Sequence, residues 1–222
     1  QQCKATVISP FLNKPKQIYP STQDFLSAIT QPGLQVIAEL KQKSPSTGIL
    51  CQHNQLEIIA KQYQAGRAAA ISVLTDTPYF GGQMLDLHRI KLATELPLLC
   101  KDFIIDELQI ELARHYGADA VLLIVRILDI ETLLRLKAKI ESLNMLALIE
   151  IFDEADLNKA LAISPKVLMI NHRDLDTLEL DTHLANELIA KIPKDMAIVV
   201  ASGILRPEQV LELDARIAAV LI

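Results

Sequence analysis

The chain has 222 residues, of which 50% are hydrophobic, and a formal net charge of -5 at pH 7. This length can bury one large core, while the mild acidity, the few aromatic residues and the lack of long apolar runs argue against nucleic-acid and membrane partners. Three widely spaced cysteines and scattered histidines predict no metal site and a reducing, cytoplasmic location.

The first 34 residues are predicted to form an N-terminal arm followed by one extra helix. Three prolines make residues 1–20 irregular. A helix start follows at residues 21–24, and Phe25, Leu26 and Ile29 would form the apolar face of that helix. Pro32 and Gly33 would end it, so residues 1–34 are expected to precede the main domain.

From residue 35 onward, short apolar runs alternate with amphipathic segments. The runs are rich in Val, Ile and Leu, as expected of strands that are buried on both faces. The predicted strands are 35–40, 69–74, 97–100, 119–125, 145–149, 166–170, 196–201 and 217–222. The predicted helices between them are 55–65, 84–94, 106–116, 130–143, 153–163, 182–191 and 207–214.

This alternation predicts one α/β domain over residues 35–222, a (β/α)8 TIM barrel. An open doubly wound sheet is the alternative. No GxGxxG turn follows the first strand, which disfavours the dinucleotide-binding form of that alternative.

Polar residues follow the predicted strands, at the end where a barrel carries its active site. Glu39 and Lys41 share one face of the first strand, because side chains two residues apart point the same way. Later strands end in Thr75-Asp76, Lys101-Asp102, Arg126, Glu150, Asn171 and Ser202-Gly203. These groups could form plain ion pairs at the rim. The convergence of two lysines and two glutamates on one mouth favours an active site.

At these positions the chain resembles the indole-3-glycerol phosphate synthases. Seven blocks agree with that family in order and spacing over residues 21 to 222. The blocks are IAELK with SPS (37–46), AISVLTD with YFGG (70–82), LCKDFIID (99–106), GADAVLLI (117–124), IEIFD (149–153), NHRDL (171–175) and SGI (202–204). The resemblance implies an enzyme of tryptophan biosynthesis that needs no cofactor or metal. It would convert a small phosphorylated substrate, 1-(2-carboxyphenylamino)-1-deoxyribulose 5-phosphate, to indole-3-glycerol phosphate with loss of CO2 and water.

The resemblance also implies four catalytic residues. Lys101 matches the family's general acid at the substrate carbonyl or the departing hydroxyl. Lys41 matches a second active-site lysine, and the division of work between the two lysines stays open. Glu39 matches the glutamate that pairs with these lysines, and Glu150 matches the general base or proton shuttle.

Six further residues match positions that bind the substrate. Asn171 and Arg173 would orient it, Arg173 being suited to a carboxylate. Ser44 lies in the loop expected to close over the anthranilate group, and Phe103 is either a wall for its ring or part of the core. Ser202 and Gly203 match the turn whose backbone N–H groups approach the phosphate.

The chain also departs from the family pattern. Ala201 stands where the family has glutamate, so a catalytically impaired barrel that binds the same anthranilate and phosphate ligand is the alternative function. A different barrel enzyme acting on a phosphorylated sugar is disfavoured by Glu39, Lys41 and the KDF block. In the NHRD block, His172 is expected to be exposed in a loop. Phe152, two residues after Glu150, stands where the family commonly has histidine.

The chain stops inside the last predicted strand. We therefore expect the final barrel helix and the second half of the phosphate site to be missing, as in a truncated form of a longer chain. A fused domain, or association with other enzymes of tryptophan biosynthesis, is compatible with this expectation.

Overall fold

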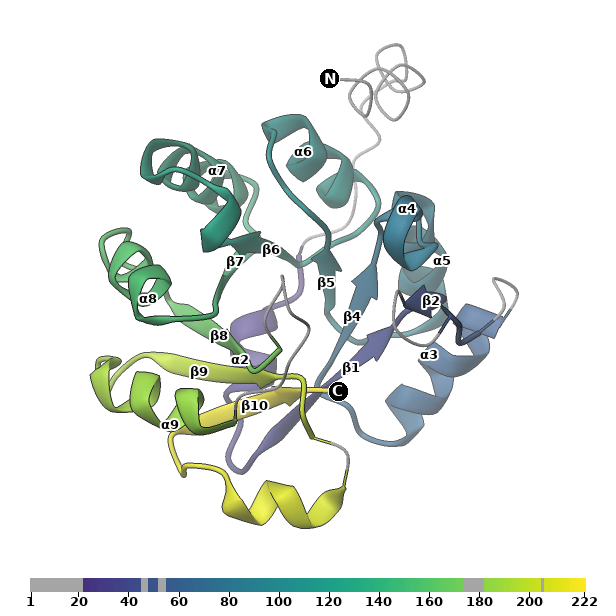
Figure 1. Ribbon diagram of the computed structural model, residues 1–222. Coiled ribbons are helices and arrows are strands. Elements are labelled where there is room, and N and C mark those ends of the chain that lie inside the picture. Colours follow the sequence, from purple (N-terminus) through teal and green to yellow (C-terminus); the bar gives the residue numbers. More distant parts are fainter. Residues whose placement is uncertain (1–21, 45–47, 52–54, 174–181, 205) are drawn as a thin grey trace.

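Eight parallel strands form a closed barrel, and most helices lie in a ring around it (Figure 1). The computed structural model describes residues 22–44, 48–51, 55–173, 182–204 and 206–222. The barrel strands are Gln35–Leu40 (β1), Ala70–Leu74 (β4), Leu98–Lys101 (β5), Ala120–Ile124 (β6), Leu146–Ile151 (β7), Val167–Asn171 (β8), Ala197–Ala201 (β9) and Ile217–Leu221 (β10). Lys43–Ser44 (β2) and Gly48–Ile49 (β3) form a separate antiparallel pair.

The helices outside the barrel connect one strand to the next. They are Leu56–Ala65 (α3), Thr77–Phe80 (α4), Met84–Ala93 (α5), Glu107–His115 (α6), Ile130–Ser142 (α7), Glu154–Leu161 (α8) and Thr182–Lys191 (α9), with 3-10 helices at Val125–Ile127 (η3) and Pro207–Glu212 (η4). None of the described helices combines the length and the apolar character that crossing a membrane would require.

Every predicted strand is present, and the strand order confirms the barrel. Neighbours follow the order β1-β10-β9-β8-β7-β6-β5-β4, and each pair is parallel. The barrel closes where Gln35 pairs with Ala219 and Ile37 pairs with Leu221. The closed order excludes the open doubly wound sheet. It also brings the carboxyl ends of all eight strands to one mouth.

The strands are apolar on both faces because each face meets a different core. Inward side chains such as Leu99, Leu148 and Met169 fill the barrel interior. Outward side chains such as Val121 and Ile170 pack under the helices. Burial on both faces explains why the strand sequences are apolar runs and not alternating patterns.

The extra helix predicted near the N-terminus is present as Phe25–Ile29 (α2) and packs against the barrel interior. Asp24 caps it by accepting a hydrogen bond from the Ser27 amide at 2.9 Å. Its Phe25 and Ile29 side chains are buried with the inward residues of the strands. The Gln23 amide donates at 2.8 Å to Asp119, just before β6 begins. The helix therefore lies at the amino-terminal end of the barrel and leaves the opposite mouth to the polar strand ends.

The segment predicted as a helix at 207–214 forms the shorter 3-10 helix η4. Pro207 stands at its first turn, where the missing N–H is tolerated. The Gln209 side chain donates at 3.2 Å to the carbonyl of Gly203, so the segment is tied to the end of β9. Three further features, the β2–β3 pair, α4 and η3, were not predicted from the sequence.

Candidate active site

Glu39 receives two lysines at the barrel mouth, one on each carboxylate oxygen. Lys101, at the end of β5, donates to Oε2 at 2.6 Å. Lys41, just after β1, donates to Oε1 at 2.7 Å. Glu39 and Lys101 come from strands that are not neighbours in sequence, so the closed barrel brings them together. The structure thus brings together three of the four residues that were predicted to be catalytic.

Burial and charge compete at this cluster. The Glu39 side chain is 8% exposed, Lys101 is 20% exposed and Lys41 is 37% exposed. Burial alone would raise the pKa of Glu39, but the two lysines outweigh it and lower the pKa to about 2. Burial would lower the pKa of Lys101, whereas Glu39 and Glu150 raise it above its ordinary value. Both groups of the pair are therefore charged at neutral pH.

Glu150 on β7 is the second carboxylate of the mouth. It is buried, and the Asn171 amide on β8 donates to its Oε1 at 3.0 Å. Burial raises the pKa of Glu150, while Lys101 and Asn171 oppose that rise. A carboxyl group with a raised pKa exchanges its proton closer to neutral pH than an ordinary glutamate does. The amide oxygen of Asn171 also accepts the Arg173 backbone N–H at 3.1 Å, which orders the end of β8.

The residues after Lys101 are held by neighbouring strand ends. Thr75 donates to Asp102 Oδ2 at 2.6 Å, and the Phe103 amide donates to Asp102 Oδ1 at 2.8 Å. Phe103 packs against the inner core and meets the ring of Tyr79 edge-on, with 6.1 Å between the ring centroids. Phe103 is only partly buried. It therefore belongs in part to the core and in part to the surface near the mouth.

Ser44 lies in β2, where it pairs with Gly48 of β3. Its neighbours Pro45 and Ser46 lie outside the described residues. The hairpin begins directly after Lys41, so the predicted substrate-closing loop starts at the barrel mouth. The hairpin is anchored to α4, because Lys43 donates to the Pro78 carbonyl at 2.9 Å.

The predicted phosphate turn has a left-handed backbone. Ser202 and Gly203 have φ values of 67° and 82°. Glycine adopts that conformation freely, whereas Ser202 does so at a steric cost. A turn of this kind can direct successive backbone N–H groups towards an anion. Ala201, at the end of β9, is buried in the inner core, so no carboxylate enters the mouth from this strand.

His172 is buried, which corrects the expectation that it is exposed in a loop. Its backbone N–H donates to the Ala201 carbonyl at 3.0 Å, and its Nδ1 lies 3.1 Å from the Ser202 carbonyl oxygen. Both contacts join His172, the first residue after β8, to the end of β9. His172 thus joins the end of β8 to the predicted phosphate turn.

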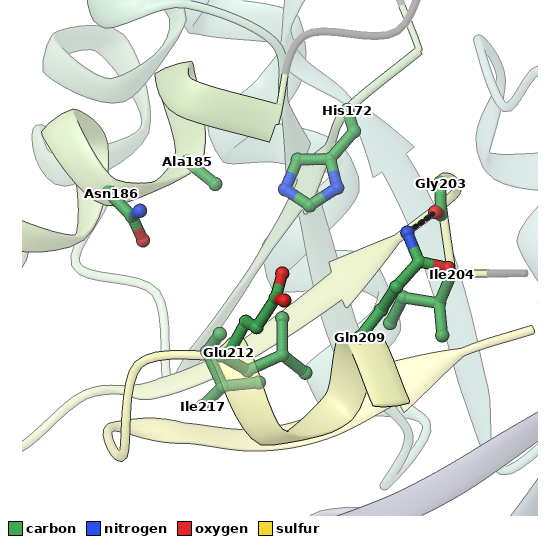
Figure 2. A pocket seen from close by; sticks show the side chains of 9 residues that line it. His172, Ala185, Asn186, Gly203, Ile204, Gln209, Glu212 and Ile217 are labelled. Carbon is green, nitrogen blue, oxygen red and sulfur yellow. Dashed lines mark hydrogen bonds between the residues drawn. The ribbon is translucent and has the colours of Figure 1, made fainter. Parts of the chain in front are cut away.

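A pocket of about 230 Å³ lies beside this turn, and Glu39 is not part of its lining (Figure 2). It is lined by residues of α9 and η4 and by residues at or next to the ends of β8, β9 and β10. Its lining residues are His172, Ala185, Asn186, Gly203, Ile204, Gln209, Glu212, Leu213 and Ile217. Gly203 is the one predicted site residue in this lining.

Two side chains that support the mouth were missed by the sequence analysis. Tyr63 on α3 donates from its hydroxyl to the Glu39 carbonyl at 3.1 Å. Thr75, noted only as a strand end, is buried and holds Asp102. No local pattern marks Tyr63, because it lies 24 residues from its partner.

The mouth holds both a proton donor and a proton acceptor. A partly buried ammonium, Lys101, is kept charged by Glu39, which suits it to donate a proton to a carbonyl or a leaving hydroxyl. A buried carboxyl group, Glu150, has a raised pKa and can accept or return a proton. This arrangement supports acid–base chemistry on a small substrate.

Sequence comparisons place the chain in a known family. A family model described as indole-3-glycerol phosphate synthase matches residues 2–222. A protein of that name from Aliarcobacter butzleri is 44% identical over 193 residues, which cover 86% of this chain and 72% of the relative. One from Chloroherpeton thalassium is 41% identical over 208 residues, covering 91% and 80%. One from Parafrankia sp. is 39% identical over 193 residues, covering 87% and 72%.

Comparisons of structure agree on the barrel. The N-acetylmannosamine-6-phosphate 2-epimerase from Clostridium perfringens aligns with a TM-score of 0.66 at 15% identity, covering 92% of each chain. The 3-hexulose-6-phosphate synthase from Salmonella typhimurium aligns with a TM-score of 0.62 at 12% identity, covering 85% of this chain and 88% of its own. At such low identity these likenesses show a shared fold.

Proposed function

The chain belongs to the indole-3-glycerol phosphate synthase family, and we propose that Glu39, Lys41, Lys101 and Glu150 carry its reaction. The enzyme is a carboxy-lyase of tryptophan biosynthesis that acts on a small phosphorylated substrate. The observation that carries the assignment is the double ion pair in which Glu39 holds Lys101 and Lys41 at 2.6 and 2.7 Å.

Lys101 acts as the general acid of ring closure. The anilino ring carbon that bears the carboxylate attacks the substrate ketone, and the ketone oxygen takes a proton from the Lys101 ammonium. The new carbon–carbon bond leaves the ring carbon ready to lose CO2, whose bonding electron pair returns to the ring. Glu39 supports this role because it keeps Lys101 protonated in spite of burial.

Glu150 acts as the general base of the dehydration. The hydroxyl formed from the ketone leaves as water after protonation by a lysine ammonium. One proton must then leave the neighbouring CH2 carbon to complete the indole, whose nitrogen keeps its hydrogen. The buried carboxylate of Glu150 is suited to accept such a proton because its pKa is raised. Lys41 assists at the mouth as the second cation paired with Glu39.

The substrate is held by the remaining predicted residues. Arg173 offers a fork of donors for the carboxylate. Phe103 gives the anthranilate ring of the substrate an apolar surface. Ser44 belongs to the hairpin that would close over the same anthranilate group. Ser202 and Gly203 bind the phosphate through backbone N–H groups. Asn171 orders Glu150 and Arg173 through the two hydrogen bonds described above.

The catalytic roles are tested by replacing Lys101 and Glu150 and following ring closure through indole fluorescence. Lys101→Ala and Glu150→Gln should each lower kcat by ~10²-fold or more, because each removes an acid or a base from the chemical step. The acidic limb of kcat/KM should lie above pH 4.5 in the parent, since the pKa of Glu150 is raised from that value, and it should vanish in Glu150→Gln.

Arg135→Ala is the matched control, because it breaks only an exposed ion pair with Glu107, at 2.8 Å, between the outer helices α7 and α6. It should keep the parent kcat. Retention of the parent kcat by Lys101→Ala or Glu150→Gln would refute the role of that residue.

The proposal also covers where the protein is located, how the chain divides into domains and which macromolecules it meets. A cytoplasmic location is supported by the free thiols of Cys51 and Cys100 among the described residues. A division into residues 1–34 and a barrel over 35–222 is supported by the start of β1 at Gln35. Other enzymes of tryptophan biosynthesis, or a fused domain, remain the proposed macromolecular partners.

A further inference from the structure

Gln42 marks the point where the chain leaves the barrel mouth and returns to it. Its carbonyl accepts the amides of Leu50 at 2.8 Å and Cys51 at 3.2 Å, so the two ends of the hairpin segment meet at this residue. The Cys51 thiol also donates to the Lys41 carbonyl at 3.4 Å. The placement of Lys41 and of the hairpin that begins with Lys43 and Ser44 therefore depends on how Gln42 is held.

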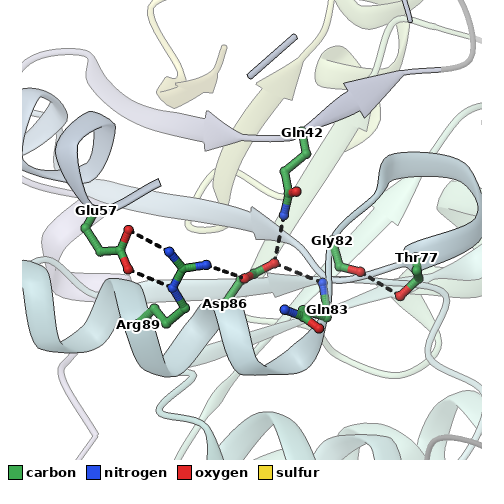
Figure 3. A network of polar contacts seen from close by, with 7 residues as sticks. All are labelled: Gln42, Glu57, Thr77, Gly82, Gln83, Asp86 and Arg89. Atoms are coloured by element: carbon green, nitrogen blue, oxygen red, sulfur yellow. Dashed lines mark hydrogen bonds and ion pairs between the residues drawn. The ribbon is translucent and has the colours of Figure 1, made fainter. Parts of the chain in front are cut away.

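The side chain of Gln42 is held by a buried carboxylate. Its Nε2 donates to Asp86 Oδ2 at 2.9 Å (Figure 3). Asp86 is 1% exposed and lies in the first turn of α5, where the same oxygen accepts the Gln83 backbone N–H at 3.0 Å. Its other oxygen lies 3.5 Å from Arg89.

Asp86 is itself fixed by its surroundings. Arg89 forms two hydrogen bonds, at 2.7 and 2.8 Å, with Glu57 on α3. At the start of α5, a Cβ on Gly82 would lie 1.9 Å from the Leu74 carbonyl oxygen, so α5 begins in close contact with β4. The carboxylate that binds Gln42 is thus carried by α5, which is linked to α3 through Arg89 and packs closely on β4 at its start.

We propose that Gln42 and Asp86 are positioning residues that hold Lys41 and the β2–β3 hairpin against the barrel mouth. The inference rests on the proposed function, because Gln42 acts through Lys41. Tyr63 fixes the backbone before Lys41 through the Glu39 carbonyl, and Gln42 fixes it after Lys41. The Lys41 side chain is long and 37% exposed, so its 2.7 Å contact with Glu39 depends on a backbone that is held on both sides.

The test replaces Gln42 in the whole chain and measures kcat, KM and the urea midpoint. Gln42→Ala should lower kcat/KM by about 10- to 100-fold, mostly through kcat, because a displaced catalytic group loses rate steeply with distance. Its urea midpoint should stay near that of the parent, because Gln42 is partly exposed. Gln42→Glu should lose more activity, because it places a second carboxylate against Asp86.

A double variant separates positioning from general damage. In Gln42→Glu/Asp86→Asn, the new amide can donate to the new carboxylate, so part of the activity lost in Gln42→Glu should return. Gln64→Ala is the matched control. The Gln64 side chain also joins two elements, accepting from the Thr94 hydroxyl and from the Glu95 amide at 2.8 Å, but it lies at the opposite end of the barrel. Its kcat/KM should equal that of the parent.

The outcomes distinguish this inference from the proposed function. If Lys41→Ala loses rate while Gln42→Ala behaves like Gln64→Ala, the inference is overturned and the role of Lys41 stands. A Gln42→Glu/Asp86→Asn variant no more active than Gln42→Glu also overturns it. If Lys41→Ala keeps the parent rate, the proposed role of Lys41 fails and the inference falls with it.

Discussion

At the scale of single residues, Glu39 sets the charge state of the candidate site. Its carboxylate is shared between two lysines, and both oxygens are used. Removal from water penalises a charged group, and here two opposite charges at contact distance more than compensate. The same carboxylate keeps the partly buried Lys101 protonated, so the proposed acid of the reaction depends on an ionised Glu39.

Glu39→Gln should change how stability depends on pH. The pKa of Glu39 is lowered from 4.5 to about 2 on folding, so its contribution is present above pH 4.5 and is lost as the pH falls towards 2. The free energy of unfolding of the parent should exceed that of Glu39→Gln by an amount that shrinks by about 2–3 kcal/mol over this range. Urea unfolding at a series of pH values measures it. A difference that stays constant with pH would contradict the assignment.

At the scale of elements, the helices around the barrel begin at aspartates that the sequence itself supplies. The side chains of Asp106, Asp129 and Asp153 each accept a hydrogen bond from a backbone N–H in the first turn of α6, α7 and α8. In α6 the Gln109 side chain reaches back to the amides of Ile105 and Asp106 and donates to the Phe103 carbonyl at 3.0 Å. The cap of α6 therefore also orders the loop that follows Lys101.

Asp106→Ala should lower the free energy of unfolding by about 1 kcal/mol, because a first-turn N–H of α6 loses its acceptor. Glu107→Ala in the same turn is the control. It breaks only an exposed ion pair with Arg135 and should cost less than about 0.5 kcal/mol. Urea midpoints of the two variants give the comparison. Equal losses would show that the cap of α6 contributes nothing beyond surface charge.

At the scale of the whole molecule, the two ends of the barrel have different roles: one carries the candidate site and the other carries a stabilising polar network. The carboxyl end gathers Glu39, Lys101 and Glu150, whereas the amino-terminal end is joined by Asp119. That buried carboxylate accepts from Lys91 at 2.6 Å, from the Leu98 amide at 2.8 Å and from the Gln23 amide at 2.8 Å. It thereby ties α5, β5 and the segment before α2 to the start of β6.

Asp119→Ala should therefore reduce stability without altering catalysis. It leaves Lys91, 15% exposed, and two backbone amides without their acceptor, which should cost about 3 kcal/mol in the free energy of unfolding. Asp119→Asn keeps one acceptor oxygen and should cost less. The kcat of the folded fraction should match the parent in both variants. A fall in kcat with an unchanged urea midpoint would contradict this division between the two ends.

Much of the fold could be predicted because its signals are local. The Val, Ile and Leu runs mark strands that are buried on both faces, and each predicted run is a barrel strand. Aspartate before an amphipathic segment marks a helix start, as at Asp106. The segment at 207–214 was predicted less well, because periodicity cannot separate a 3-10 helix from a short α-helix.

The sequence by itself determined the alternation of strands and helices, the polar residues that follow the first seven barrel strands, and the family to which the chain belongs. Only the tertiary structure decided which of these residues meet. Lys101 lies 62 residues from Glu39, and Asp86 lies 44 residues from Gln42. His172 is buried because the ends of β8 and β9 pack together. Local propensity acts over a few residues, whereas these contacts arise when eight strands close into one barrel and bring their ends to a common mouth.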